Sequence, residues 1–222
     1  MRASSHSSMT GRSFPKPTNR PVKTAVAVYV KYPEPGRVKT RLAADVGPEQ
    51  AALAYQRMLT HVLDVSLDPL PPGCELILWC DPYRPLEDYR KRFGSYTLRA
   101  QSGKDLGERL NDTFATLLEA HEAAITVGSD CVRIEPKHIK ETLEQLHRGA
   151  DLVLGPAEDG GYYLIAMKKN HPPLFSGIDW STDRVLEQTL QKAREQGLAV
   201  HQLERLPDID TLADWDNSGL TL

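Results

Sequence analysis

The chain of 222 residues has few cysteines and no apolar run near the length of a bilayer. No membrane segment is therefore expected. The three cysteines, Cys74, Cys80 and Cys131, are odd in number and form no C-x-x-C pair, which argues against a disulfide framework and against a structural zinc site. A reducing, cytoplasmic setting is expected.

Acidic residues are missing from the first 23 positions, which hold five basic residues. The segment is rich in Ser, Arg and Pro and lacks the apolar region of a secretory signal, so residues 1–22 are predicted to form a disordered basic tail. The rest of the chain carries 22 basic and 30 acidic residues. Because binding to a phosphate backbone needs a broad cationic face, a nucleic-acid partner is not expected.

The chain does have a regular alternation of apolar runs and segments of helical period, typical of βαβ units in a mostly parallel sheet covered on both faces. One helix should open at Gly47 and Pro48, and another should run over residues 180–197 with Ser181 or Thr182 as its N-cap. The run 162–167 follows its predecessor too closely for a crossover and should pair antiparallel. A single domain over residues 23–222 is expected. Strands are predicted at residues 24–30, 75–80, 96–101, 123–128, 151–155, 162–167 and 199–206.

A basic loop follows the first predicted strand. The segment KYPEPGRVKTRL holds Lys31, Arg37, Lys39 and Arg41 against a single acid. Ligands of α/β sheets bind at the carboxyl ends of strands, so a loop of this charge suits a polyphosphate. A solvated basic loop without a ligand is the alternative.

Asp130 stands just beyond the carboxyl end of the predicted strand 123–128. A carboxylate there can hold Mg²⁺ while the metal bridges phosphate oxygens. A second donor comes from PDIDT, where Asp208 and Asp210 point the same way if the segment is extended, and Asp210 is taken as the second ligand. Either segment could instead be a helix cap or a turn.

The segment EDGGYYL places Asp159 before two glycines and two tyrosines. It could be a simple turn. A flexible backbone and aromatic rings at a strand end also suit an acceptor pocket, in which Asp159 orients or deprotonates a hydroxyl.

The segment QSGKDLGERL contains Gly103, Asp105, Gly107 and Arg109. Backbone N–H groups at a helix start can meet an anion, so this segment is a candidate for recognising the nucleotide. A plain loop and helix start is the alternative.

Several motifs in the same order resemble the radical-SAM/selenodomain-associated transferase family, largely uncharacterised bacterial proteins that are similar to nucleotide-diphospho-sugar transferases of the GT-A fold. The resemblance spans about residues 24–214. It implies a GT-A type, Rossmann-like three-layer α/β/α sandwich and a Mg²⁺ or Mn²⁺ cofactor. The motifs are KYPEPGRVKTRL, GKDLGERL, VGSDC, VLGPAEDGGYYLIAM, LFSGIDWST and PDIDT.

The resemblance also implies roles for single residues. Lys31, Lys39 and Arg41 would face the nucleotide phosphates, and Asp130 would hold the metal. The acceptor pocket would be bordered by Asp159, Gly160, Gly161, Tyr162, Trp180, Ser181 and Thr182. The chain departs from the family at Val132, where proline is favoured, and GSDC has one aspartate where typical GT-A glycosyltransferases have D-x-D.

Together these features predict a metal-dependent transferase with Asp130 and Asp159 as catalytic residues. Its partners would be a nucleotide-activated donor, first of all an NDP-sugar, and an unknown acceptor. The alternative is a nucleotidyltransferase that releases pyrophosphate from an NTP, resembling phospholactate guanylyltransferase. A third reading is a nucleotide-binding sensor without turnover.

Overall fold

The computed structural model describes residues 23–221, so the predicted tail at residues 1–22 lies outside the described residues. The strands are β1 (Thr24–Val30), β2 (Cys74–Cys80), β3 (Thr97–Ala100), β4 (Ala123–Gly128), β5 (Leu152–Pro156), β6 (Tyr162–Met167) and β7 (Val200–Gln202). The α-helices are α1 (Thr40–Val46), α2 (Pro48–His61), α3 (Leu86–Phe93), α4 (Leu106–Leu118), α5 (Pro136–Arg148), α6 (Val185–Glu195) and α7 (Leu212–Ser218). A π-helical turn η1 (Val62–Ser66) and a 3₁₀ turn η2 (Pro172–Phe175) complete the elements.

The strands form one seven-stranded sheet in the order β3-β2-β1-β4-β6-β5-β7. All neighbours pair in parallel except β6, which runs antiparallel to β4 and to β5. The prediction of a mostly parallel mixed sheet with an antiparallel run at 162–167 is therefore confirmed. The segments that follow β1, β2, β4 and β5 meet at one edge of the sheet, together with the segment that leads into β6.

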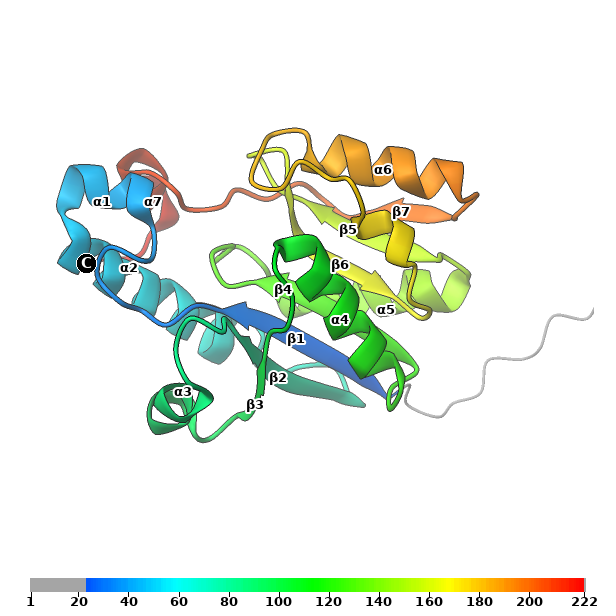
Figure 1. Ribbon diagram of the computed structural model, residues 1–222, viewed down its shortest axis with the longest axis horizontal. Helices are drawn as coiled ribbons and strands as arrows, with labels where there is room; N and C mark the ends of the chain where they lie inside the picture. The colour runs from blue at the N-terminus through cyan, green and yellow to red at the C-terminus, as the bar shows by residue number, and fades with distance from the viewer. Residues whose placement is uncertain (1–22, 222) are drawn as a thin grey trace, which may run out of the picture.

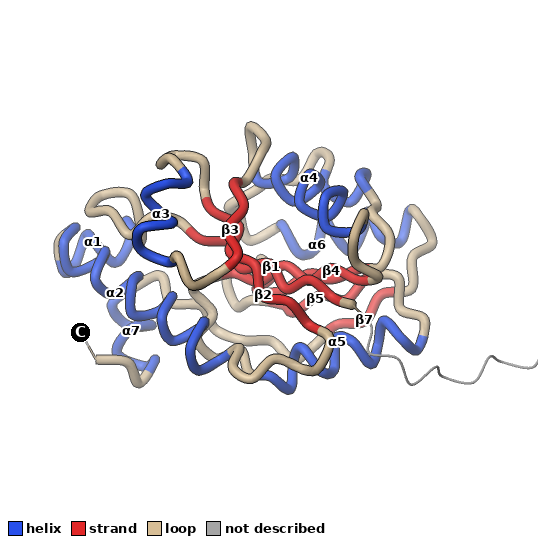
Figure 2. Tube along the Cα trace, turned by 90° about the horizontal axis from the view of Figure 1, so that it is seen from below, coloured by secondary structure: helices blue, strands red, loops and turns tan. Residues whose placement is uncertain are grey.

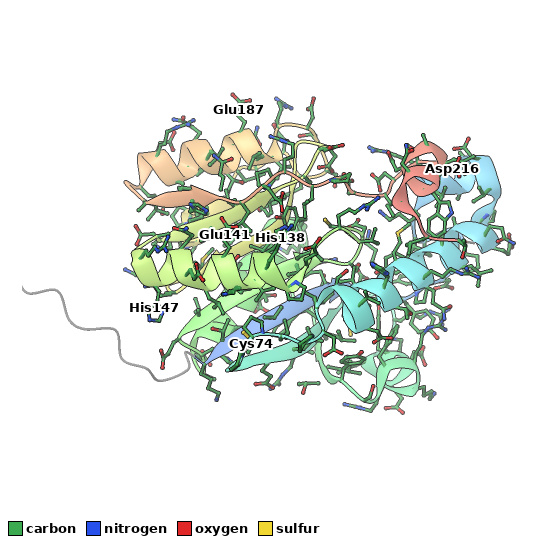
Figure 3. The ribbon with its side chains drawn as sticks, turned by 180° about the vertical axis from the view of Figure 1, so that it is seen from behind. Cys74, His138, Glu141, His147, Glu187 and Asp216 are labelled. Atoms are coloured by element: carbon green, nitrogen blue, oxygen red, sulfur yellow. The ribbon has the colours of Figure 1, made fainter. Side chains whose placement is uncertain are left out.

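Helices cover both faces of the sheet, which confirms the predicted three-layer α/β/α sandwich (Figures 1 and 2). Helices α4 and α6 lie on one face, and α2 and α5 lie on the other, which Figure 3 shows from behind. Side chains of β1 alternate between the two layers: Val28 belongs to the core that contains Met58 of α2, while Ala27 packs in the core that contains Phe114 of α4. Within residues 23–221, no helix has the length and apolar character needed to span a membrane.

The helix starts agree with the sequence in part. Helix α2 begins at Pro48 after Gly47, as predicted. The helix expected over residues 180–197 begins only at Val185, so the prediction of Ser181 or Thr182 as its N-cap is wrong. The reason is local: the backbone of Ser181 is left-handed with φ 65°, and the Thr182 hydroxyl donates to the carbonyl of Asp179 at 2.7 Å.

The C-terminal segment crosses the carboxyl edge of the sheet and ends in α7, beside α1 (Figure 1). The predicted strand 199–206 shortens to residues 200–202, although the N–H of Leu206 still donates to the Pro156 carbonyl at 3.0 Å. The buried side chains of Ile209 and Trp215 anchor the segment in the core. Because Ile209 points inward, its neighbours at 208 and 210 turn toward the pocket described below.

The turn between β5 and β6 depends on Gly160, whose φ is +87° and whose missing Cβ would lie 2.2 Å from the carbonyl oxygen of Asp183. We expect Gly160→Ala to lower the free energy of unfolding by about 2–4 kcal/mol, because a left-handed penalty adds to a steric clash. Urea titration measures this change. Gly36→Ala is the control, since its φ is +77° but nothing lies within 4 Å. Equal losses for both variants would contradict the close approach to Asp183.

Candidate functional site

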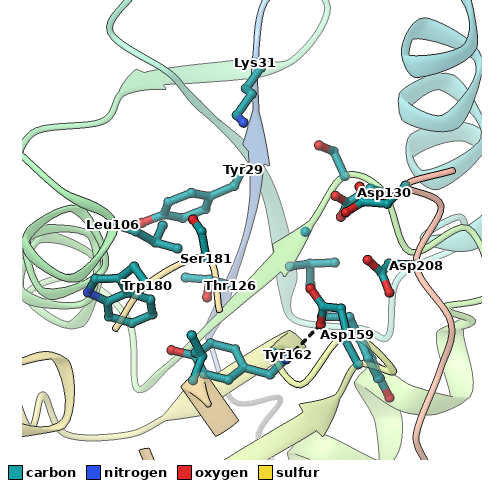
Figure 4. A pocket seen from close by; sticks show the side chains of 18 of the residues that line it. Tyr29, Lys31, Leu106, Thr126, Asp130, Asp159, Tyr162, Trp180, Ser181 and Asp208 are labelled. Carbon is teal, nitrogen blue, oxygen red and sulfur yellow. Dashed lines mark hydrogen bonds between the residues drawn. The ribbon is translucent and has the colours of Figure 1, made fainter. Parts of the chain in front are cut away.

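A pocket of about 1040 Å³ opens at the carboxyl edge of the sheet (Figure 4). Pockets of about 300–1,000 Å³ hold drug-sized ligands, so this one has room for a donor and an acceptor together. The predicted site residues that line it are Lys31, Lys39, Arg41, Arg109, Asp130, Asp159, Gly161, Tyr162, Trp180, Ser181, Thr182 and Asp210. Four other residues named as candidates from the sequence, Gly103, Asp105, Gly107 and Gly160, do not belong to its lining.

Lys39 places its ammonium group between two carboxylates. Its Nζ lies 2.9 Å from Asp130 Oδ2 and 2.8 Å from Asp210 Oδ1, and its side chain is only 6% exposed. Burial disfavours a charged lysine, but the two carboxylates outweigh burial and raise the pKa of Lys39. Burial likewise acts to raise the pKa of Asp130, yet the Lys39 charge holds that pKa below its usual range. Lys39 and Asp130 are therefore both charged at neutral pH.

The sequence did not predict that these groups pair with one another. That Lys39 and Arg41 meet phosphates and that Asp130 and Asp210 hold a metal stays a prediction, and the structure adds ion pairs among the same residues. Arg41 Nη1 also donates to Asp210 Oδ2 at 3.2 Å, from a side chain that is 69% exposed. The basic and acidic motifs thus converge on one site and neutralise each other in part.

The backbone of Lys39 is in the left-handed region, with φ 45° and ψ 52°, and helix α1 begins immediately after it. The predicted basic loop is therefore shorter than expected, and Arg41 is a helical residue. A left-handed conformation costs a residue other than glycine about 1–2 kcal/mol. Such strain persists where surrounding contacts determine the conformation, and here Val38 is buried beside Tyr55 while the Lys39 side chain is held by two aspartates.

The other bases of the loop have separate surroundings. The guanidinium carbon of Arg37 lies 3.4 Å from the centre of the Tyr83 ring, outside the pocket lining. Lys31 lines the pocket with an exposed side chain and makes no ion pair within residues 23–221. Lys31 and Arg41 are therefore the cations with most freedom to meet an anionic ligand.

Tyr55 of α2 links the ends of β1 and β4. Its hydroxyl accepts a hydrogen bond from the backbone N–H of Lys31 at 2.9 Å and lies 2.9 Å from the Ser129 hydroxyl. Burial raises the pKa of Tyr55 to about 12, so the hydroxyl keeps its proton. The sequence did not single out Tyr55, because a core tyrosine and a positioning tyrosine have the same periodicity in a helix.

Four aspartates crowd the acidic side of the pocket: Asp130, Asp159, Asp208 and Asp210. Burial, reinforced by the charges of Asp159 and Asp130, raises the pKa of Asp208 to about 6. Lys39 and Arg41 offset only part of this negative charge. Carboxylate oxygens with excess negative charge fit Mg²⁺ or Mn²⁺ in donor type and in charge. Within residues 23–221, no three His, Cys, Asp or Glu side chains are already arranged to hold a metal ion. The cation that lies between Asp130 and Asp210 is the Lys39 ammonium.

The segment before α4 has structural partners. Asp105 caps α4 by accepting from the N–H of Glu108 at 2.8 Å. Arg109 Nη1 donates to Asp81 Oδ2 at 3.0 Å, and its Nε donates to the Gly103 carbonyl at 3.2 Å. Asp81 also lines the pocket, and it could not be identified from the sequence because a single aspartate after β2 belongs to no motif.

The turn before β6 is closed by its own aspartate. Asp159 Oδ1 accepts from the backbone N–H of Gly161 at 2.8 Å, which Figure 4 shows as a dashed line. The carboxylate is exposed and lines the pocket beside Asp208 and Tyr162. Asp159 is thus both a turn residue and a pocket residue.

We expect Lys39→Met in EDTA to lower the free energy of unfolding by about 2 kcal/mol, because Asp130 and Asp210 lose their shared counter-ion. The loss of a fully buried pair costs about 3–5 kcal/mol, and partial exposure of both aspartates reduces it. Arg41→Met is the matched control and should cost less than about 0.5 kcal/mol, since Arg41 is largely exposed. Chemical denaturation measures both, and equal losses would contradict the central position of Lys39.

Asp208→Asn should stabilise the protein more at high pH than at low pH. The folded-state pKa of Asp208 is about 6, above the ordinary value near 3.9, so ionisation costs stability as pH rises from about 4 through 6. In EDTA, the gain in the free energy of unfolding should be about 1–2 kcal/mol larger at pH 8 than at pH 4.5, after allowance for partial exposure. Asp45→Asn, on the exposed side of α1, is the control. A gain that does not change with pH would contradict the crowding of the carboxylates.

Comparison with known proteins places the chain among bacterial proteins. The family described as uncharacterized protein conserved in bacteria (DUF2064) matches residues 70–182, just over half of the chain. A candidate nucleotide-diphospho-sugar transferase from Desulfovibrio desulfuricans G20 is 33% identical with a TM-score of 0.81, over 88% of this chain and 85% of that chain. No curated protein matches the sequence.

More distant structures show the fold alone. A CMP:2-keto-3-deoxy-manno-octonic acid synthetase complexed with CTP has a TM-score of 0.56 at 14% identity, over 88% of this chain and 96% of that chain. Glucosyl-3-phosphoglycerate synthase from Mycobacterium tuberculosis, in complex with Mn²⁺, UDP-glucose and glycerol 3-phosphate, has a TM-score of 0.55 at 12% identity, over 88% and 75%. These likenesses confirm the predicted GT-A type fold. From the family match and the relative at 33% identity, the chain belongs to the DUF2064 family of bacterial proteins.

Proposed function

We propose that this protein is a divalent-metal-dependent transferase that takes an NDP-sugar and passes the sugar to an acceptor hydroxyl. The observation that carries the proposal is the convergence, in one pocket, of Lys31, Lys39 and Arg41 with Asp130 and Asp210. A nucleotide diphosphate needs cationic side chains, and the metal that accompanies it needs carboxylates. The relative at 33% identity, described as a candidate nucleotide-diphospho-sugar transferase, supports the same class of donor.

Asp130 and Asp210 would hold Mg²⁺ or Mn²⁺. When bound, such an ion offsets the charge that develops on the leaving diphosphate. Lys31 and Arg41, which are exposed in the pocket, would bind the diphosphate oxygens, and the Lys39 ammonium would add a third positive charge beside them.

Asp159 is the proposed base. In the transfer, the bond between the sugar C1 and the diphosphate oxygen breaks, and its electron pair leaves with the diphosphate. The acceptor oxygen forms the new bond to C1, and its proton passes to the Asp159 carboxylate. The hydrogen bond from the Gly161 N–H fixes Oδ1 of this carboxylate, so the group is oriented before an acceptor arrives.

Nucleotidyl transfer is the second candidate. The end of β4 has one aspartate, Asp130, where typical GT-A glycosyltransferases have D-x-D, and Lys39 lies 2.9 Å from this aspartate. The products separate the two reactions. A nucleotidyltransferase releases pyrophosphate from an NTP, whereas a glycosyltransferase releases NDP from an NDP-sugar.

Three further expectations remain proposals. Residues 23–222 are proposed to form a single domain, and the motifs support membership in the radical-SAM/selenodomain-associated branch of the family. A reducing, cytoplasmic setting is supported by Cys74, Cys80 and Cys131, which are free thiols.

We expect UDP, GDP or CDP to raise the melting temperature with MnCl₂ and to raise it far less in EDTA. A nucleotide at about 100 times its Kd adds about 2.7 kcal/mol of stability, which a thermal melt resolves. Asp130→Asn should remove the metal-dependent part, and Asp45→Asn, which changes the same charge away from the pocket, should keep it. If none of the nucleotides shifts the melt under either condition, the proposed donor class is wrong.

A further inference from the structure

The pocket has a second side that differs in chemistry from the charged side. Tyr29 of β1, Leu106 of α4, Tyr162 of β6 and Trp180 of the loop before α6 form a wall that we call the aromatic side. Figure 4 shows these four side chains on one side of the pocket and Asp130, Asp159 and Asp208 on the other. Lys31 lies at the top, between the two sides. A ligand that fills the pocket therefore contacts charged side chains on one side and aromatic side chains on the other.

Leu106 is exposed to this space. Its side chain belongs to the few large hydrophobic groups that are exposed within residues 23–221, with 39% of its surface accessible, and it lines the pocket. An exposed leucine beside aromatic rings in a concave site is typical of a surface that a ligand covers. Covering this apolar surface would stabilise a complex.

The backbone around Trp180 fixes the position of its indole ring. A Cβ on Gly107 would lie 2.7 Å from Trp180 Nε1 and 2.5 Å from the Phe175 carbonyl oxygen, so the indole packs on a helix turn that only glycine allows. The next residue, Ser181, has the left-handed φ of 65° that costs a non-glycine residue energy. The loop thus holds the indole at the pocket wall in one place.

Among the described residues that line the pocket, no cation is directed to the aromatic side. The guanidinium of Arg109, the basic residue of α4 that lines the pocket, is turned to Asp81, at 3.0 Å. Lys39 and Arg41 are paired with the aspartates of the charged side. Lys31 lies between the two sides, where the proposed function assigns it to the diphosphate of the donor. A phosphorylated acceptor between Trp180 and Tyr162 would therefore have no cationic side chain of its own, and it would lie close to the excess negative charge of the aspartates.

We infer that the acceptor is an uncharged alcohol with an apolar or aromatic body, which packs against Leu106, Tyr162 and Trp180 and presents its hydroxyl to Asp159. The inference rests on the proposed function, since it assigns the acceptor class of the same transfer. Trp180 and Leu106 are then specificity-determining residues, while the ions across the pocket select the donor.

Intrinsic fluorescence tests this inference, because Trp79 and Trp215 are buried and Trp180 is half-exposed in the pocket. Cyclohexylmethanol is the probe, since it has an apolar body and one hydroxyl and does not absorb where indole is excited. We expect a saturable shift of the emission to shorter wavelength, both with and without the nucleoside diphosphate that gives the largest thermal shift with MnCl₂. Glycerol 3-phosphate, at the same concentrations, should give no shift.

Variants separate binding from folding. Trp180→Phe should abolish the fluorescence change but keep the calorimetric Kd of the probe within about 3-fold. Leu106→Asn, at an exposed position, should weaken the probe at least 10-fold while the Kd of the nucleoside diphosphate stays unchanged. These results would support the assignment of the aromatic side to the acceptor.

Other outcomes overturn it. Displacement of the probe by the nucleoside diphosphate would show that the aromatic side holds the base, and equal binding of glycerol 3-phosphate would show that charge is tolerated there. Failure of the probe to bind would refute the acceptor class even if nucleotides bind. If the probe binds but no nucleotide does, the proposed transferase function is wrong, and the pocket is a binding site for an apolar alcohol only.

Discussion

The ion pairs of the Lys39 ammonium with Asp130 and Asp210 determine how this site is assembled. They join three segments, since Lys39 is 91 residues from Asp130 and 171 residues from Asp210 in the sequence. Taking a lysine out of water is unfavourable, and so is the left-handed backbone that aims it. Two carboxylates at 2.8 and 2.9 Å offset both costs, so the loop after β1, the end of β4 and the C-terminal crossover are held at one point.

The fold explains why these groups meet. The carboxyl ends of β1 and β4 are neighbours in the sheet, and the reversed direction of β6 brings the turn with Asp159 to the same edge. The C-terminal segment then crosses this edge, and Ile209 and Trp215 hold it there because they are buried in the core that also contains Met58 of α2. The result is a pocket with more carboxylates than cations, in which an added metal and an anionic ligand would restore the balance of charge.

The sequence predicted the scaffold well, because strands such as β1 and β4 are continuous apolar runs and the short link before β6 allows only antiparallel pairing. It also selected most of the charged residues of the pocket, since basic and acidic motifs at strand ends share one edge of a parallel sheet. It could not predict that Lys39 pairs with Asp130 and Asp210, because pairing over such separations depends on where the C-terminal segment crosses.

Two other features escaped prediction for related reasons. Tyr29 and Leu106 have the pattern of ordinary strand and helix residues, and only the structure shows that they face a pocket. The late start of α6 at Val185 depends on the left-handed Ser181 and on the contact of Gly107 with Trp180. Local N-cap preferences contain no information about such tertiary contacts.

The cations of the β1 loop and the carboxylates of β4 and the C-terminal crossover are proposed to serve one anionic ligand. An anomalous difference map of crystals soaked with MnCl₂ and a nucleoside diphosphate shows whether they do. We expect a manganese peak at the Asp130 and Asp210 oxygens and diphosphate density against Lys31, Lys39 and Arg41. Manganese or diphosphate bound outside this pocket, with Lys39 still between the two aspartates, would contradict it.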